Sequence, residues 1–204
     1  MGNLAHFDLT ALIERHGLHH FVETGTGQGQ GLLHAARFNF RTLRSCDIEP
    51  SLAHTVSRHI ASDSRISVVT EQSPVFLRWA CRLLPRDEPI LFWLDAHFPG
   101  ADYGIRGYGG EPDEGTRLPL PQELALIANL RPEGRDVILI DDLRIWLDAP
   151  FASGNLPADV RPFCPRKRDA SFFAEKLGAT HDVSFDYANE GYVTALPKEK
   201  VLAC

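Results

Sequence analysis

The stretch 21–31, with the sequence FVETGTGQGQG, constrains the fold of this chain more than any other. Two apolar residues open it, and glycine then occupies every second position from Gly25 to Gly31. Glycine suits a turn that needs positive φ, or a backbone that a ligand must approach closely. Free N–H groups at the start of a following helix favour an electron-rich ligand. The pattern therefore predicts a buried strand, a ligand-binding turn and a helix.

Spacing decides between the nucleotide-binding loops that have this shape. The dinucleotide pattern G-x-G-x-x-G would need glycine or alanine at Gln30 if it began at Gly25, or at Leu32 if it began at Gly27. The P-loop needs a lysine directly after its last glycine, and no lysine follows any of these glycines. A plain strand-to-helix turn without a ligand is the remaining structural alternative.

The spacing E-x-G-x-G-x-G, formed by Glu23, Gly25, Gly27 and Gly29, resembles motif I of the class I S-adenosyl-L-methionine (SAM) dependent methyltransferases. The resemblance implies that the turn from Gly25 to Gly29, Thr26 included, lies against the amino-acid end of SAM. It also implies that Glu23 helps to hold the ammonium group of SAM. SAM is therefore the expected cofactor, and a small molecule is the expected methyl acceptor.

Length and composition exclude several classes of protein. With 204 residues, the chain is long enough for one well-buried domain, which we place at residues 1–204. The net charge of −6 disfavours a nucleic-acid surface, and no apolar run is long enough to span a membrane. The four cysteines are scattered, which predicts neither a zinc site nor a disulfide framework. We expect a reduced, soluble, cytoplasmic protein, and a homodimer stays open.

Alternating strands and helices define the expected architecture. After an N-terminal helix and lead-in over residues 1–20, strands are expected to start at 21 and to cover 41–47, 65–70, 89–95, 136–142, 181–187 and 192–197. The helices between them are expected at 32–37, 50–60, 73–84, 121–130 and 170–177. This order predicts an α/β fold with a doubly wound, Rossmann-like sheet, mostly parallel, that ends in an antiparallel hairpin. The methyltransferase resemblance implies seven strands.

Polar residues follow the second and third strands. A carboxylate about twenty residues past a glycine turn is placed to accept hydrogen bonds from ribose hydroxyls. Asp47 and Glu49 both qualify, and the family pattern "D-I-x-P" favours Asp47. After the third strand the family has a "G-D-S"-like turn that contacts adenine. This chain has Gln72 before Ser73 there, so the contact would come from an amide in place of a carboxylate.

Acidic residues also end the fourth and fifth strands, at Asp95, Asp141 and Asp142. Asp95-Ala96-His97-Phe98 lacks the prolines of enzymes that methylate the amino groups of bases. The arrangement is more similar to metal-dependent, catechol-type O-methyltransferases, which implies that the three acids hold Mg²⁺ or Ca²⁺. Asp95 would also contact SAM. His97 is the alternative, as a general base that needs no metal.

Two loops rich in glycine, proline and charge, at 98–119 and 146–168, are expected to border the active site, since long loops in compact domains are usually functional. The segments Glu-Thr-Gly-Thr and Trp-Leu-Asp-Ala-His, with Pro-Leu-Pro-Gln-Glu-Leu and the fifth strand, are also similar to small bacterial methyltransferase-like proteins. We expect an enzyme that methylates oxygen, with His97, Asp95 and Asp141 in the chemistry. A SAM-fold scaffold without activity and transfer of another SAM-derived group are the alternatives.

Overall fold

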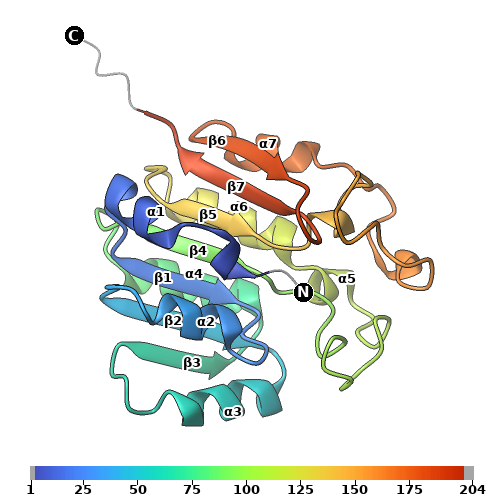
Figure 1. The fold of residues 1–204 in the computed structure, drawn as a ribbon, viewed down its shortest axis with the longest axis horizontal. Coiled ribbons are helices and arrows are strands. Elements are labelled where there is room, and N and C mark those ends of the chain that lie inside the picture. The colour runs from blue at the N-terminus through green and yellow to red at the C-terminus, as the bar shows by residue number, and fades with distance from the viewer. Residues whose placement is uncertain (1–2, 200–204) are drawn as a thin grey trace.

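Seven strands form one mixed sheet in the order β3-β2-β1-β4-β5-β7-β6 (Figure 1). They belong to a computed structural model that describes residues 3–199. Neighbouring strands from β3 to β5 are parallel, and β7 is antiparallel to both β5 and β6. The strands are β1 (His20–Thr24), β2 (Thr42–Asp47), β3 (Ile66–Thr70), β4 (Ile90–Leu94), β5 (Val137–Ile140), β6 (His181–Asp186) and β7 (Tyr192–Pro197).

Helices cover both faces of the sheet (Figure 1). Alternate residues of the central strands enter different apolar clusters, as the two-residue period of a strand requires. Phe92 belongs to the cluster that includes residues of α4, α6 and α7, whereas Leu91 belongs to the one that includes residues of α1, α2 and α3. The helices are α1 (Leu9–His16), α2 (Gln30–Ala35), α3 (Pro50–His59), α4 (Ser73–Leu83), α5 (Glu114–Arg117), α6 (Leu120–Leu130) and α7 (Ser171–Leu177).

Local chemistry explains where the helices begin and end. Proline stands in the first turn of α3, α4 and α6, where its missing N–H costs nothing. Gly17 ends α1 with φ of 60°, the left-handed conformation that favours glycine. The parallel strands β1 and β4 are buried along their whole length, which accounts for the unbroken apolar sequence of β4. In β1 the buried residues include the polar His20, Glu23 and Thr24.

The structure confirms the predicted fold class, with seven strands and a C-terminal antiparallel hairpin. Differences are confined to element ends and loops. Helix α2 begins at Gln30, earlier than expected, because Gly29 already adopts the left-handed conformation at its N-cap. The 98–119 loop contains α5, whose first turn is capped by the Asp113 side chain accepting from the Thr116 N–H. A 3₁₀ helix, Arg161–Phe163, interrupts the second loop.

The strand order reverses between β1 and β4, because the chain runs from β1 outward to β3 and then returns to β4. Ligands of doubly wound sheets bind outside the carboxyl ends of the strands at such a reversal. The glycine turn after β1 and the acidic residues after β4 therefore meet at one place. This topology positions the candidate site.

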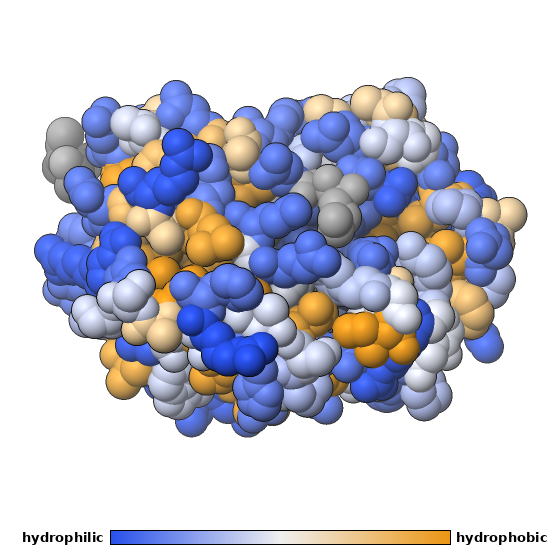
Figure 2. Space-filling view, turned by 60° about the horizontal axis from the view of Figure 1, so that its bottom comes forward, coloured by the Kyte–Doolittle hydropathy of each residue, from blue (hydrophilic) through white to orange (hydrophobic). Residues whose placement is uncertain are grey.

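The surface adds little about partners. Figure 2 shows a face on which hydrophilic residues predominate and hydrophobic residues form separate patches. Within residues 3–199, no helix is long and apolar enough to cross a bilayer. Cys46, Cys81 and Cys164 are buried free thiols, and Cys204 lies outside the described residues. The homodimer and the cytoplasmic location stay predictions.

Candidate active site

The glycine turn after β1 has the backbone that its sequence demands. Gly25, Gly27 and Gly29 have φ of 80°, 52° and 83°. These values lie in the left-handed region, where a side chain would be strained. Gly25 also has a close neighbour, since a Cβ there would lie 2.5 Å from the main-chain oxygen of Asp95. The turn is therefore packed directly on the end of β4.

Asp47, at the end of β2, holds the turn in place. Its Oδ2 accepts from the Gly27 N–H at 2.8 Å, and its Oδ1 accepts from the Glu49 N–H at 2.8 Å. Burial raises the pKa of Asp47, while these two backbone hydrogen bonds lower it. A carboxylate oxygen can accept more than one hydrogen bond, so Asp47 can still serve a ribose hydroxyl.

Glu23 is a buried carboxyl beside the turn, with 1% of its surface exposed. Its Oε2 accepts from the Ser45 hydroxyl at 2.6 Å, and that hydroxyl also bonds to Thr26. Burial raises the pKa of Glu23 well above its ordinary value, although the Ser45 hydrogen bond opposes the shift. A cationic ligand group would favour the ionised form of this carboxyl. Glu23 therefore fits the predicted ammonium contact.

A cavity of about 410 Å³ joins these residues to the ends of β4 and β5. Most predicted cofactor residues line it: Glu23, Gly25, Thr26, Gly27, Asp47, Gln72, Ser73 and Asp95. Two do not. Gly29 packs on the Val56 side chain, and Glu49 forms an ion pair with Arg106 at 2.7 Å. Of the two acids that were candidates for the ribose contact, the structure thus places only Asp47 at the cavity.

The loops contribute unequally to the cavity. Asp102, Tyr103 and Thr116 of the 98–119 loop line it. None of the described residues 147–168 does. Arg168 instead donates to the main-chain oxygens of Ile145 and Leu147, which ties the end of the second loop to its start and to the 3₁₀ turn that follows β5. Of the two loops expected to border the site, only the first lines this cavity in the described part of the chain.

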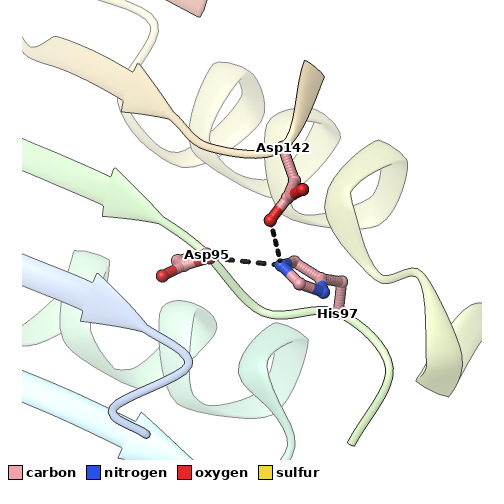
Figure 3. A group of neighbouring side chains, drawn as sticks. All are labelled: Asp95, His97 and Asp142. Carbon is pink, nitrogen blue, oxygen red and sulfur yellow. Dashed lines mark ion pairs between the residues drawn. The ribbon is translucent and has the colours of Figure 1, made fainter. Parts of the chain in front are cut away.

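Asp95, His97 and Asp142 form a close group at the sheet edge (Figure 3). His97 Nε2 lies 2.9 Å from Asp142 Oδ2 and 3.3 Å from Asp95 Oδ1, between the two carboxylates. Asp142 has φ of 50°, which is uncommon for a residue other than glycine and is typical of strained functional positions. Its other oxygen accepts from Arg144 Nε at 3.2 Å.

Mutual charge sets the protonation of this group. Burial alone would lower the pKa of His97, but the Asp142 and Asp95 carboxylates outweigh it and raise that pKa well above its ordinary value. Burial would raise the pKa of Asp142, yet His97 and Arg144 bring it below its ordinary value. Burial raises the pKa of Asp95 to about 6, even though His97 opposes the shift. At neutral pH His97 is therefore a cation shared by two carboxylates.

Asp141 lies outside this group, in contrast to the expected cluster of three acids. Its Oδ1 accepts from the Asp142 N–H at 2.7 Å, which turns the carboxyl toward its own backbone. Burial, together with the charges of Asp95 and Asp142, raises the pKa of Asp141 well above its ordinary value. Among residues 3–199, the side chains close enough together to share one ion are those of Asp95, His97 and Asp142. His97 thus takes the place that was expected for Asp141.

Two residues at the site, Gly31 and Glu123, escaped the sequence interpretation. Gly31 lies against Glu23, since a Cβ there would overlap Glu23 Oε1. Tyr103, in contrast, belongs to the 98–119 loop that was expected to border the site, and it reaches over the turn, where its hydroxyl would overlap a Cβ on Gly27. Glu123 lies on α6 with none of its surface exposed. A sequence signal for Glu123 did exist, because it shares the apolar face of its helix with Leu120 and Leu124.

Comparisons of sequence find no relatives: no protein-family model matches the chain, and no curated protein is significantly similar to it. Comparisons of structure find proteins of similar fold. A candidate caffeoyl-CoA O-methyltransferase from Staphylococcus aureus is 9% identical with a TM-score of 0.61, over 97% of this chain and 85% of that chain. An O-methyltransferase from Bacillus cereus, in complex with S-adenosyl-L-homocysteine (SAH), is 15% identical with a TM-score of 0.59, over 93% of this chain and 79% of that chain.

A third solved structure widens the range of chemistry. The N-methyltransferase NodS from Bradyrhizobium japonicum, in complex with SAH, is 13% identical with a TM-score of 0.50, over 89% of this chain and 84% of that chain. Enzymes that methylate oxygen and nitrogen thus share this architecture, and at these identities the likeness concerns the fold alone. The chain has the Rossmann-like fold of the class I SAM-dependent methyltransferases.

Proposed function

We propose that this protein is a SAM-dependent methyltransferase that acts on a hydroxyl group of a small molecule. One observation carries the proposal: a single cavity is lined by Glu23 and the glycine turn at one end and by Asp95, His97 and Asp142 at the other. A methyl donor on the turn would thus point at a group able to bind and deprotonate an acceptor. Such positioning supplies much of the rate enhancement of a two-substrate reaction.

The charge of the cavity wall favours SAM over NAD. Among the described residues that line the cavity, the only cationic side chains are Arg78 and the protonated His97. Its acids are Asp47, Glu71, Asp95, Asp102, Asp113 and Asp142, together with Glu23 and Asp141, whose pKa burial raises well above the ordinary value. SAM carries a sulfonium and an ammonium group, whereas NAD carries a pyrophosphate that this wall would repel. The same field disfavours acceptors with phosphate groups. We therefore expect an acceptor that is neutral or cationic.

The residues at the end of β4 suit proton removal from a hydroxyl. A general base works best when its pKa lies near the ambient pH, and burial gives Asp95 a pKa of about 6. His97, already protonated, is a poor base in this state. Its positive charge would instead offset the charge that the acceptor oxygen gains on losing its proton. Asp142 holds His97 in position for that role.

The group also fits a divalent cation. The ligand atoms of Asp95, His97 and Asp142 all lie within 4.8 Å of one another. Two carboxylates and an imidazole suit Mn²⁺, Fe²⁺ or Zn²⁺ better than Mg²⁺ or Ca²⁺, which prefer oxygen ligands. When bound, such an ion would make an acceptor hydroxyl more acidic. His97 would have to lose its proton to become a ligand.

Transfer of a labelled methyl group tests the proposal. The protein is incubated with SAM labelled in its methyl group and with a panel of phenols, catechols and amines of small size, with EDTA or with added Mn²⁺. We expect label on a hydroxylated acceptor and a product one methyl group heavier. Label on amines alone would contradict oxygen as the acceptor atom. Equal rates of transfer in EDTA and in Mn²⁺ would show that the reaction needs no divalent metal.

A further inference from the structure

A small void of about 10 Å³ lies behind the Asp95, His97 and Asp142 group, on the side of α6. Its apolar wall is made by Leu94, Leu120, Ile140, Ile145 and Trp146. Four polar residues also line it, namely Asp95, His97, Glu123 and Asp141. The void has about the size that one water molecule occupies, and a buried water needs two to four polar partners.

Three of these polar residues present buried atoms without a hydrogen-bond partner in the described chain. They are His97 Nδ1, both carboxyl oxygens of Glu123 and Asp141 Oδ2. Buried polar groups are nearly always hydrogen-bonded, because a buried group without a partner loses its hydrogen bonds to water and gains none in return. Three such residues around one void of this size therefore point to a shared water molecule.

The place of Glu123 in the helix is unusual for a carboxyl. It lies on the buried face of α6, beside Leu124 and Ile127, and none of its surface is exposed. The Ser73 and Thr24 hydroxyls lie beside it and lower its pKa, yet neither contact has hydrogen-bond geometry. A leucine would pack at this position without the cost of burying a polar group. A role outside packing would explain why a carboxyl is there.

We propose that Glu123 is a positioning residue for His97, which it holds through one water molecule bound in this void, with Asp141 Oδ2 as the third partner of that water. The proposal rests on the proposed function of the Asp95, His97 and Asp142 group. The two ring nitrogens of His97 then have separate roles. Nε2 faces the two carboxylates at the cavity, while Nδ1 donates to the water, which fixes the angle of the ring.

Two variants of Glu123 and one control variant test this idea. Glu123→Gln keeps an oxygen that can accept from the water, whereas Glu123→Leu removes it and fits the apolar surroundings. Asn129→Leu, at an exposed position of the same helix, controls for adding a leucine to α6. Each variant is examined with SAH present by crystallography and by ¹⁵N NMR of the histidine rings, with His97→Gln used to assign the His97 signals.

We expect the wild-type crystal to show a water within hydrogen-bond distance of His97 Nδ1, Glu123 and Asp141. Glu123→Leu should lose this water and shift the His97 Nδ1 resonance, while Glu123→Gln and Asn129→Leu should leave that resonance at its wild-type position. A dry void in the wild type, or an unchanged His97 signal in Glu123→Leu, would overturn the proposal.

The neighbouring hydroxyls define the rival role for Glu123. If it served the cofactor through Ser73 and Thr24, Glu123→Leu would weaken SAH binding tenfold or more and leave the His97 signal in place, which would also overturn the proposal. Failure of the proposed function has a different signature, because wild-type protein would then bind neither SAM nor SAH. The crystal and the NMR signals report on Glu123 in either case.

Discussion

The backbone of Gly25 is packed against the main-chain carbonyl of Asp95, so that a Cβ on Gly25 would lie 2.5 Å from that oxygen. Through this contact the glycine turn after β1 and the acidic end of β4 support each other. The Asp95 N–H also donates to the Thr24 main-chain oxygen at 3.0 Å, which continues the pairing of the two strands. A change in the turn should therefore disturb both the part of the cavity proposed to bind SAM and the part proposed to bind the acceptor.

Gly25→Ala tests this coupling. The new Cβ would meet backbone atoms of Asp95 and Ala96, which cannot rotate away as a side chain can. We expect SAM affinity to fall at least tenfold, about 1.4 kcal/mol, in a calorimetric titration. Gly154→Ala is the matched control, because Gly154 has a similar φ of 79° but no atom within 4 Å of its Cβ position. Equal loss of affinity in both variants would mean that backbone strain alone is responsible.

The charge of Asp142 should determine the protonation of His97. Asp142→Asn removes the closer of its two carboxylate partners, so we expect the His97 pKa to fall by more than about one unit, equivalent to about 1.4 kcal/mol. NMR titration of the ring signals measures it. Asp141→Asn should move the His97 pKa much less. Burial raises the pKa of Asp141 well above its ordinary value, so this carboxyl carries less negative charge near His97. A larger effect from Asp141→Asn would contradict the geometry of the group.

Glu123 should make stability depend on pH. Burial raises its pKa to about 7 in the folded protein, from 4.5 in the unfolded chain. The folded state therefore binds more protons between these pH values, and stability falls as pH rises through them. Glu123→Gln has no group that titrates here. Its free energy of unfolding relative to that of the wild type should therefore rise by up to about 3 kcal/mol as pH increases from 4.5 to 7, and should stay constant above pH 7. Urea unfolding at pH 5 and pH 8 measures this gain, and an equal difference at both would contradict it.

Trypsin should first cut the 98–119 loop after Arg106. The Arg106 side chain is 41% exposed and is held by one ion pair with Glu49. Arg117, in contrast, is buried and donates to the main-chain oxygens of Phe163 and Glu111. Because Tyr103 of this loop lies over Gly27, SAM should slow the cut by contacting the loop. First cleavage after Arg117, or a rate that SAM leaves unchanged, would argue against a loop that responds to the cofactor.

The sequence predicted the backbone of the site better than its side chains. Glycine spacing and apolar runs depend on local geometry, and they located the turn and the ends of β4 and β5. The direction of a carboxyl depends on competition among nearby donors. Asp141 and Asp142 are adjacent, yet one accepts from the backbone and the other pairs with His97. The void beside Glu123 depends on packing between α6 and the sheet, which no sequence spacing encodes.

Calorimetric titration of the wild-type protein with SAM, SAH and NAD tests the central claim most directly. The cavity joins a glycine turn, a buried Glu23 and an acidic wall that suits a cationic cofactor. We predict that SAM and SAH bind with dissociation constants in the micromolar range, about −8 kcal/mol, and that NAD gives no heat of binding. Binding of NAD without binding of SAM or SAH would contradict the account.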